Sequence, residues 1–575
     1  MTFKATEQST QENILIPSNI IIKSWADVAP FFEELLQFKF TELSELKNWL
    51  QIRSDLEAML QEEMGWRYIR FTCDTENEVL KQDLDLFIEE IEPKIALYQN
   101  KLNTILEHSG LIEELAKDPE YKIFIRNFKI EMKLFREESL DLIAEVQSLS
   151  NDYGKISSGF MVQIDGLDYT FNQGANFLKS TDRNKRKQVY EAIVNRRLSE
   201  KEKFNQLFDN LLQKRHAVAQ QAGYVNYRDY MFDALFRFDY TPDDAKVFHQ
   251  SIQEIIVPIC QIFDQKRKDT LDYASLKPYD LEVDLSGGSN IEPYKDGKDL
   301  IAKTTQCFSR VKPEYAHYVE KMNEMGHLDL DSRKGKAPGG YNYPLYKSGV
   351  PFIFMNSASS VRDMVTMIHE GGHAIHSFLS QPLKLTAFKN FPSEIAELAS
   401  MSMELITLDY WDTYINDIDE LKRAKRYHLE KTISILPWIA AVDAFQHWLY
   451  ENPNHNIDER ESEWIKIFSS FHGDLIDWSD YPDVKANMWH KQLHIFEVPF
   501  YYIEYAIAQL GAIAVWKNFK QNPETALQAF EKALSAGNTL TLPELYELAG
   551  IKFSFERAYI DELMQFILKE MNEIV

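Results

Sequence analysis

Apolar residues recur at the three- and four-residue spacing of helix faces over most of the chain. From Ser24 to about Leu106 they alternate with charged residues in this way, and a second helical stretch covers about residues 121–149. The pattern resumes after residue 180 and continues to about Lys268. From Val361 to the end, helix dominates again. The pattern predicts a mostly α-helical protein.

Two segments interrupt the helical pattern. In residues 157–173, apolar and β-branched residues flank Asp165-Gly166, a dipeptide that favours a tight turn, and we expect a short hairpin there. Gly, Pro and aromatic residues concentrate between Pro278 and Asn356, a segment that ends in the apolar run VPFIFMN. We therefore expect a small β element just before residue 361.

The composition is that of a large protein with a substantial core. Hydrophobic residues make up 45% of the 575 residues, and 63 Lys+Arg against 89 Asp+Glu give a formal net charge of −26. This charge disfavours nucleic acid and anionic membranes as partners, because both attract a surplus of Lys and Arg. The strongest apolar stretch, Ile435–Val442, contains Pro437, which we expect to kink a helix. It is far shorter than the about 20 residues of a membrane span.

The cysteines and the N-terminus indicate the compartment. Cys73, Cys260 and Cys307 form no CxxC pair and predict no disulfide framework, which is typical of a reducing environment. Residues 1–19 contain no apolar segment of signal-peptide length. We therefore expect a soluble, cytoplasmic protein.

The main chemical motif is His369-Glu370-Gly371-Gly372-His373. On a helix, residues i and i+4 differ by about 40° in azimuth and by one turn in height, so both imidazoles can reach one metal ion. Glu370 lies beside the first histidine, where it can take a proton from a zinc-bound water instead of binding the metal. Zinc is the expected metal, because catalytic zinc sites commonly combine two histidines and a glutamate with an open water position.

A third protein ligand must come from elsewhere. His376 is on the same helix face, but it is seven residues, or about 10 Å, from His369 along the axis, which favours a supporting or packing role. Downstream, Glu394, Glu397 and Glu404 fall on one face of another expected helix. Spacing alone favours Glu397 only weakly over the other two acids.

These residues resemble the extended motif of the M3 family of zinc oligopeptidases, which includes oligoendopeptidase F and thimet oligopeptidase. HEGGHAIH is followed by E-x-x-S-x-x-x-E, and the resemblance implies that His369, His373 and Glu397 bind one zinc ion per chain. It also implies that Glu370 is the general base and that Glu404 supports the ligands. The stretches KGKAPGGYNYP and PFIFMN resemble the family's substrate-side loop and edge strand.

The C-terminal stretch HIFEVPFYYIEYAIAQ resembles the family's His/Tyr segment. The resemblance implies that His494, Tyr502 and Tyr505 bind the substrate and the transition state, since neutral His and Tyr donors can stabilise an oxyanion. Larger animal-type members carry a further Tyr five residues after this His. Here that position is Pro499, and Tyr501 is the candidate replacement. An aromatic stripe alone would equally predict core packing.

The resemblance implies a two-lobed helical body with a deep channel that admits short, unstructured peptides. We assign residues 1–180, including the hairpin near 157–173, to an N-terminal helical lobe and residues 181–575 to the catalytic region. The predicted function is zinc-dependent endopeptidase activity on oligopeptides.

Two alternatives stay open at this point. One is a carboxypeptidase or dipeptidyl carboxypeptidase on a similar frame, and the other is a peptide-binding protein without catalysis. A carboxypeptidase needs a cation that grips the free C-terminal carboxylate. Candidates for that role form a basic island beside the expected cleft: Arg333, Lys334, Lys336 and Lys347.

Overall fold

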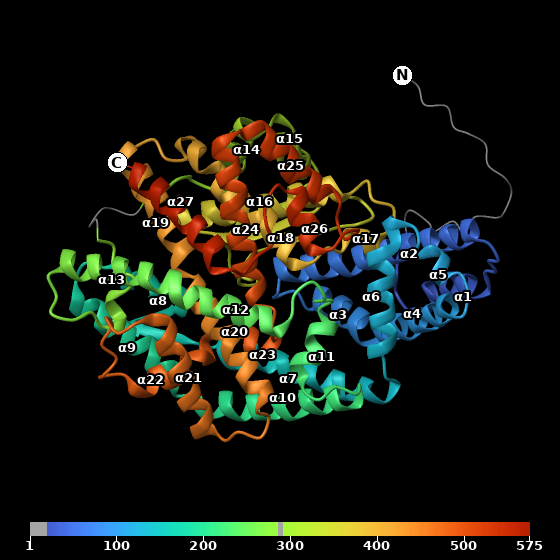
Figure 1. The fold of residues 1–575 in the computed structure, drawn as a ribbon, viewed down its shortest axis with the longest axis horizontal. Coiled ribbons are helices and arrows are strands. Elements are labelled where there is room, and N and C mark those ends of the chain that lie inside the picture. Colours follow the sequence, from blue (N-terminus) through green and yellow to red (C-terminus); the bar gives the residue numbers. More distant parts are fainter. Residues whose placement is uncertain (1–19, 286–290, 575) are drawn as a thin grey trace.

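The computed structural model describes residues 20–285 and 291–574 (Figure 1). Over these residues the chain is mainly helical, with one two-stranded and one three-stranded sheet, which confirms the predicted fold class. Residues 1–19, for which the sequence predicts no signal peptide, lie outside the described part. None of the described helices combines the length and the apolar character that a membrane crossing requires.

The N-terminal helices share a core with a segment from far along the chain. The core that α1, α2, α4, α5 and α6 form includes Leu385 and Phe388. Beside them, the Thr386 amide donates to Ser54 Oγ over 2.6 Å, so the short helix α17 (Thr386–Lys389) is fixed to this region (Figure 1). The N-terminal helices are α1 (Ala29–Gln37), α2 (Leu43–Cys73), α3 (Glu78–Leu86), α4 (Glu92–Glu107), α5 (Ile112–Leu115) and α6 (Lys122–Leu134).

A hairpin forms where the sequence predicts one. Strands β1 (Met161–Ile164) and β2 (Leu167–Thr170) pair antiparallel across Asp165 and Gly166, whose φ angles are 52° and 82°. Positive φ at both central residues is what a two-residue hairpin turn requires. Helices surround it in sequence: α7 (Leu140–Ser158), α8 (Phe171–Ala175), α9 (Arg183–Leu198), α10 (Lys201–Gln221), α11 (Tyr227–Ala234), α12 (Pro242–Ser251), α13 (Val257–Leu271), α14 (Gly297–Val311) and α15 (Pro313–Glu324).

The three-stranded sheet lies directly before residue 361, as expected. Its order is β3 (Leu328–Asp331), β5 (Phe352–Ser357), β4 (Tyr341–Tyr343), with β5 parallel to β3 and antiparallel to β4. The prediction that PFIFMN forms an edge strand is therefore wrong, because this run is the central strand and β4 is at an edge. The uninterrupted apolar run in β5 has a physical reason, since a strand covered on both faces buries consecutive residues.

The C-terminal half packs helix on helix. α18 packs against both α16 and α24. Pro437 lies next to a break between two helices: α19 ends at Ser434, and Pro437 is in the first turn of α20, where its missing N–H leaves no helical bond unmade. These helices are α16 (Val361–Ser380), α18 (Ser393–Ile406), α19 (Ile418–Ser434), α20 (Leu436–Glu451), α21 (Ile457–His472), α22 (Pro482–Ala486), α23 (Leu493–Glu497), α24 (Ile503–Gln521), α25 (Pro523–Ser535), α26 (Leu542–Leu548) and α27 (Arg557–Glu573).

Candidate active site

The helix that carries the His-Glu-Gly-Gly-His motif is fixed at its start and along its side. α16 begins soon after β5, and Ser360 caps it by accepting a hydrogen bond from the Asp363 amide while the Asp363 carboxylate accepts from the Ser360 amide. On strand β4, Asn342 Nδ2 donates to the backbone carbonyl of Glu370 over 3.1 Å. The small sheet thus positions the motif.

Gly372 allows α16 and α18 to approach closely. A Cβ atom added at this position would lie 2.5 Å from Ser400 Cα and 2.8 Å from the carbonyl oxygen of Ala399. Both neighbours are backbone atoms of α18, which cannot rotate away as a side chain can. Glycine is therefore required here for the two helices to pack as they do.

This approach brings His369, His373 and Glu397 together. Glu397 Oε2 lies 3.3 Å from His369 Nε2 and 3.8 Å from His373 Nε2, and one ligand atom of each residue lies within 4.8 Å of the others. Of the three acids that spacing left open, Glu397 is the one in this group. Glu394 is buried and accepts a hydrogen bond from Tyr240 Oη over 2.9 Å.

Glu404 orients His369 through the ring nitrogen that does not face Glu397. It accepts a hydrogen bond of 2.6 Å from His369 Nδ1, so that Nε2 is the ring nitrogen that faces Glu397. His428, on α19, approaches the other oxygen of Glu404 at 3.4 Å. Sequence reasoning did not identify His428, because no local spacing connects it with the motif.

Burial and charge set the protonation of these groups. Burial raises the pKa of Glu370 to about 7, a value suited to a group that takes up and returns a proton near neutral pH. Burial also acts to raise the pKa of Glu397, but the neighbouring His373 and His369 outweigh it and the pKa is lowered. Glu397 therefore remains a carboxylate while Glu370 can exchange a proton.

The tautomer of His494 is fixed by a chain of hydrogen bonds. Trp438 Nε1 donates to Gln492 Oε1 over 2.8 Å, which orients the amide so that Gln492 Nε2 donates to His494 Nδ1 over 2.6 Å. Burial lowers the pKa of His494 to about 4, so the ring is neutral at pH 7. The only ring proton is then on Nε2, and His494 can donate a hydrogen bond from that atom.

Three tyrosines surround His494. The ring centroids of Tyr501, Tyr502 and Tyr505 lie 6.0, 4.6 and 5.8 Å from the imidazole. Burial, and next the charge of Glu397, raise the pKa values of Tyr501 and Tyr505, so this cluster is within electrostatic reach of the His369, His373 and Glu397 group. Tyr501, the candidate replacement for the tyrosine that larger family members carry at the position of Pro499, thus belongs to this cluster.

Buried polar side chains hold the backbone of this segment. Phe500 adopts a left-handed conformation with φ 67°. Its amide donates to Gln446 Oε1 and its carbonyl accepts from Arg237 Nη2, each over 2.8 Å. Arg215, which is 1% exposed, donates to the carbonyl of Ile495 over 3.0 Å. Sequence reasoning missed these anchors, since they come from segments far away along the chain.

His376 lies apart from the group of His369, His373 and Glu397. Its ring is fully buried and stacks on Phe391, with 3.5 Å between ring centroids. This position agrees with the packing role that its spacing suggested.

Three of the four cations of the basic island are paired with acids. Asp329 pairs with both Arg333, over 2.6 Å, and Lys336, over 2.9 Å. Lys334 pairs with Glu76 over 3.1 Å. These three cations therefore already have acidic partners within the protein. This argues against the island as a binding site for the C-terminal carboxylate of a peptide.

Comparisons with known proteins agree with the motifs. The model of peptidase family M3 matches residues 176–565, and that of the peptidase M3 N-terminal domain matches residues 21–135. An oligoendopeptidase F homolog of Borreliella burgdorferi is 22% identical over 80% of this chain and 79% of its own length. An oligoendopeptidase F homolog of Mycoplasma genitalium is 23% identical over 85% of this chain and 85% of its own length.

A solved structure of PZ peptidase A with an inhibitor has the same fold. It superimposes with a TM-score of 0.87 and 27% identity, covering 95% of this chain and 97% of that one. The family model alone covers more than half of the chain. The chain therefore belongs to peptidase family M3, as its motifs predict, and within that family it is similar to oligoendopeptidase F.

Proposed function

We propose that this peptidase is a zinc-dependent endopeptidase that hydrolyses short, unstructured oligopeptides. The observation that carries the proposal is the convergence of His369, His373 and Glu397, with Glu370 beside them on α16. The cluster of His494, Tyr501, Tyr502 and Tyr505 supports it, because amide hydrolysis also needs donors for a developing oxyanion.

The three converging side chains suit one zinc ion. Two imidazole nitrogens and one carboxylate oxygen are a common catalytic donor set for zinc. The hydrogen bond from His369 Nδ1 to Glu404 leaves Nε2 available as a donor atom. A zinc ion held there supplies Lewis acidity, which polarises the scissile carbonyl and makes a water more acidic.

The proposed roles of the other residues follow from their protonation. Glu370 takes a proton from the attacking water and delivers it to the leaving amine. His494, neutral and protonated at Nε2, donates to the oxygen of the scissile carbonyl as negative charge develops on it. Tyr501, Tyr502 and Tyr505 orient the peptide and add further donors.

Restriction to short peptides is the part of the proposal that rests on the family resemblance. M3 peptidases of this type are expected to enclose the active site in a channel between two lobes. Such a channel admits an extended peptide and excludes a folded protein.

Cleavage of a peptide with an amidated C-terminus tests the proposal against carboxypeptidase action. We expect the free and the amidated form of one peptide to be cut at the same internal bond with similar rates, because Arg333, Lys334 and Lys336 are paired with acids. Mass spectrometry of the products and metal analysis before and after chelation give the result. Loss of cleavage on amidation would establish the carboxypeptidase alternative, and an inactive zinc-loaded protein would establish the peptide-binding one.

Substitution of His494 and of its partner tests the oxyanion role. We expect His494→Phe to lower kcat by about 10²-fold, as for loss of one oxyanion donor, and Gln492→Met to lower it by about tenfold, because the ring remains but its tautomer is no longer fixed. Steady-state kinetics should place both losses mainly in kcat. The control Gln528→Met changes an exposed glutamine of α25 and should have wild-type rates. Wild-type kcat for His494→Phe would remove this residue from the mechanism.

A further inference from the structure

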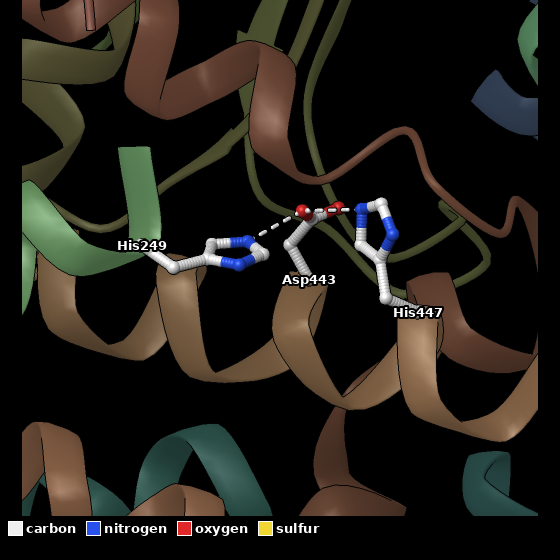
Figure 2. A group of neighbouring side chains, drawn as sticks. All are labelled: His249, Asp443 and His447. Carbon is white, nitrogen blue, oxygen red and sulfur yellow. Dashed lines mark hydrogen bonds and ion pairs between the residues drawn. The ribbon is translucent and has the colours of Figure 1, made fainter. Parts of the chain in front are cut away.

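A second group of metal-ligand type lies in the core, outside the proposed active site. His249 is on α12, and Asp443 and His447 are on α20, one helical turn apart (Figure 2). The side chains point towards one another, and one ligand atom of each lies within 4.8 Å of the others. Their exposed fractions are 8%, 1% and 3%.

The distances suit coordination of one ion. Asp443 Oδ2 lies 2.8 Å from His249 Nε2 and 3.3 Å from His447 Nε2. In a tetrahedral zinc site with bonds of about 2.0 to 2.1 Å, neighbouring ligand atoms are about 3.3 Å apart. Little movement would therefore be needed to place an ion among these three donors.

The group contains polar atoms that the protein leaves without a partner. Neither Asp443 Oδ1 nor His447 Nδ1 has a hydrogen-bond partner among the described residues, although both atoms are buried. Coordination through both carboxylate oxygens would engage Oδ1 and bring the donor atoms to four. Buried polar atoms normally have partners, and coordination of an ion would supply one to Oδ1.

The charge of the group also favours a bound cation. Within the described part of the chain, both ion-pair partners of Asp443 are histidines, with no Lys or Arg. The surroundings are aromatic: the rings of Phe248 and Phe500 lie 6.0 and 5.5 Å from those of His249 and His447. A carboxylate buried in an apolar setting is costly unless its charge is compensated, and a divalent cation would neutralise it.

We propose that His249, Asp443 and His447 bind a second divalent transition-metal ion, of the zinc type, as a closed structural site. With two imidazole nitrogens and both oxygens of Asp443, no position is left for a water or substrate, as is usual for structural zinc. The ion joins α12 to α20, two helices whose ligands are 194 residues apart in sequence. Because the adjacent Gln446 holds the amide of Phe500, the ion also braces the segment that carries Tyr501 and Tyr502.

The burial of this group makes the two sites experimentally distinct. The side chains of His369 and His373 are 21% and 18% exposed, whereas those of Asp443 and His447 are 1% and 4% exposed. A chelator should therefore remove a metal from the first site in the folded protein. A metal in the second site should be released only when the chain unfolds.

Metal counting on the full-length protein tests the inference. The protein is saturated with Zn²⁺, desalted, and measured by mass spectrometry of the metal before chelation, after chelation and after unfolding in denaturant. We expect two zinc ions per chain, one lost to the chelator together with activity and one released only on unfolding. The double variant His369→Gln/His373→Gln should be inactive and retain one ion that resists the chelator.

The double variant tests the second site by itself, because it leaves His249, Asp443 and His447 intact. A folded double variant that holds no metal, or only metal that the chelator removes, would overturn the second site and leave the proposed peptidase mechanism untouched. Adding Asp443→Asn should remove the remaining ion. The matched control His317→Gln, at an exposed His–Glu pair on α15, should leave the metal content unchanged.

Discussion

The variant Glu370→Gln should keep its zinc and lose at least about 10²-fold in kcat, the usual contribution of a general base. Glutamine has nearly the shape of glutamate, and the backbone carbonyl of Glu370 that accepts from Asn342 is unaffected. What is lost is a carboxylate whose pKa, raised by burial to about 7, suits it for accepting and returning a proton. Peptide hydrolysis and metal content are measured on the same preparation.

The control for this variant is Glu320→Gln, which removes an exposed carboxylate on α15 and should leave kcat unchanged. An unchanged rate for Glu370→Gln would exclude Glu370 as the base. Loss of the metal in Glu370→Gln would instead indicate that Glu370 helps to bind it.

The variant Gly372→Ala should lose both stability and metal affinity. The added methyl group would meet the α18 backbone at 2.5 Å, so α16 and α18 must move apart. Overpacking of this kind costs about 1 to 3 kcal/mol, which exceeds the about 1 kcal/mol that alanine gains over glycine in helix propensity. Separation of the helices also moves Glu397 away from His369 and His373. Thermal unfolding with and without Zn²⁺ and a zinc titration measure the two effects.

A glycine with free space around it provides the matched comparison. Gly154, within α7, has no atom closer than 4.0 Å to the position of an added Cβ. Gly154→Ala should therefore be neutral or slightly stabilising and should bind zinc normally. If Gly372→Ala were equally harmless, the close helix contact would have no part in forming the metal group.

Local sequence patterns predicted the parts of the fold that local physics controls. The Asp165-Gly166 turn forms where its two residues predict it, because it depends on a few neighbouring backbone angles and hydrogen bonds. The order of strands in the small sheet was not accessible in this way. It depends on which strands meet in space, and PFIFMN was placed at an edge although it is central.

The same distinction applies to the site. Helical spacing is enough to pair His369 and His373, whereas it favours Glu397 only weakly and the family resemblance is needed to identify this ligand. The contact of Glu404 with His428 and the orientation of His494 by Gln492 depend on side-chain packing that no local pattern encodes. The same holds for His249, which joins Asp443 and His447 from a separate helix.

The position of α17 couples the N-terminal helices to a site to which they contribute no ligand. The chain between α16 and α18 passes through their core at Leu385 and Phe388, and Thr386 is hydrogen-bonded to Ser54. If this packing sets the separation of the ligand helices, thermodynamic reciprocity requires that metal binding stabilise the N-terminal helices by the same free energy. The two regions that separate family models describe would then share one folding equilibrium, and the ion would act as a distant cofactor for folding of the N-terminal region.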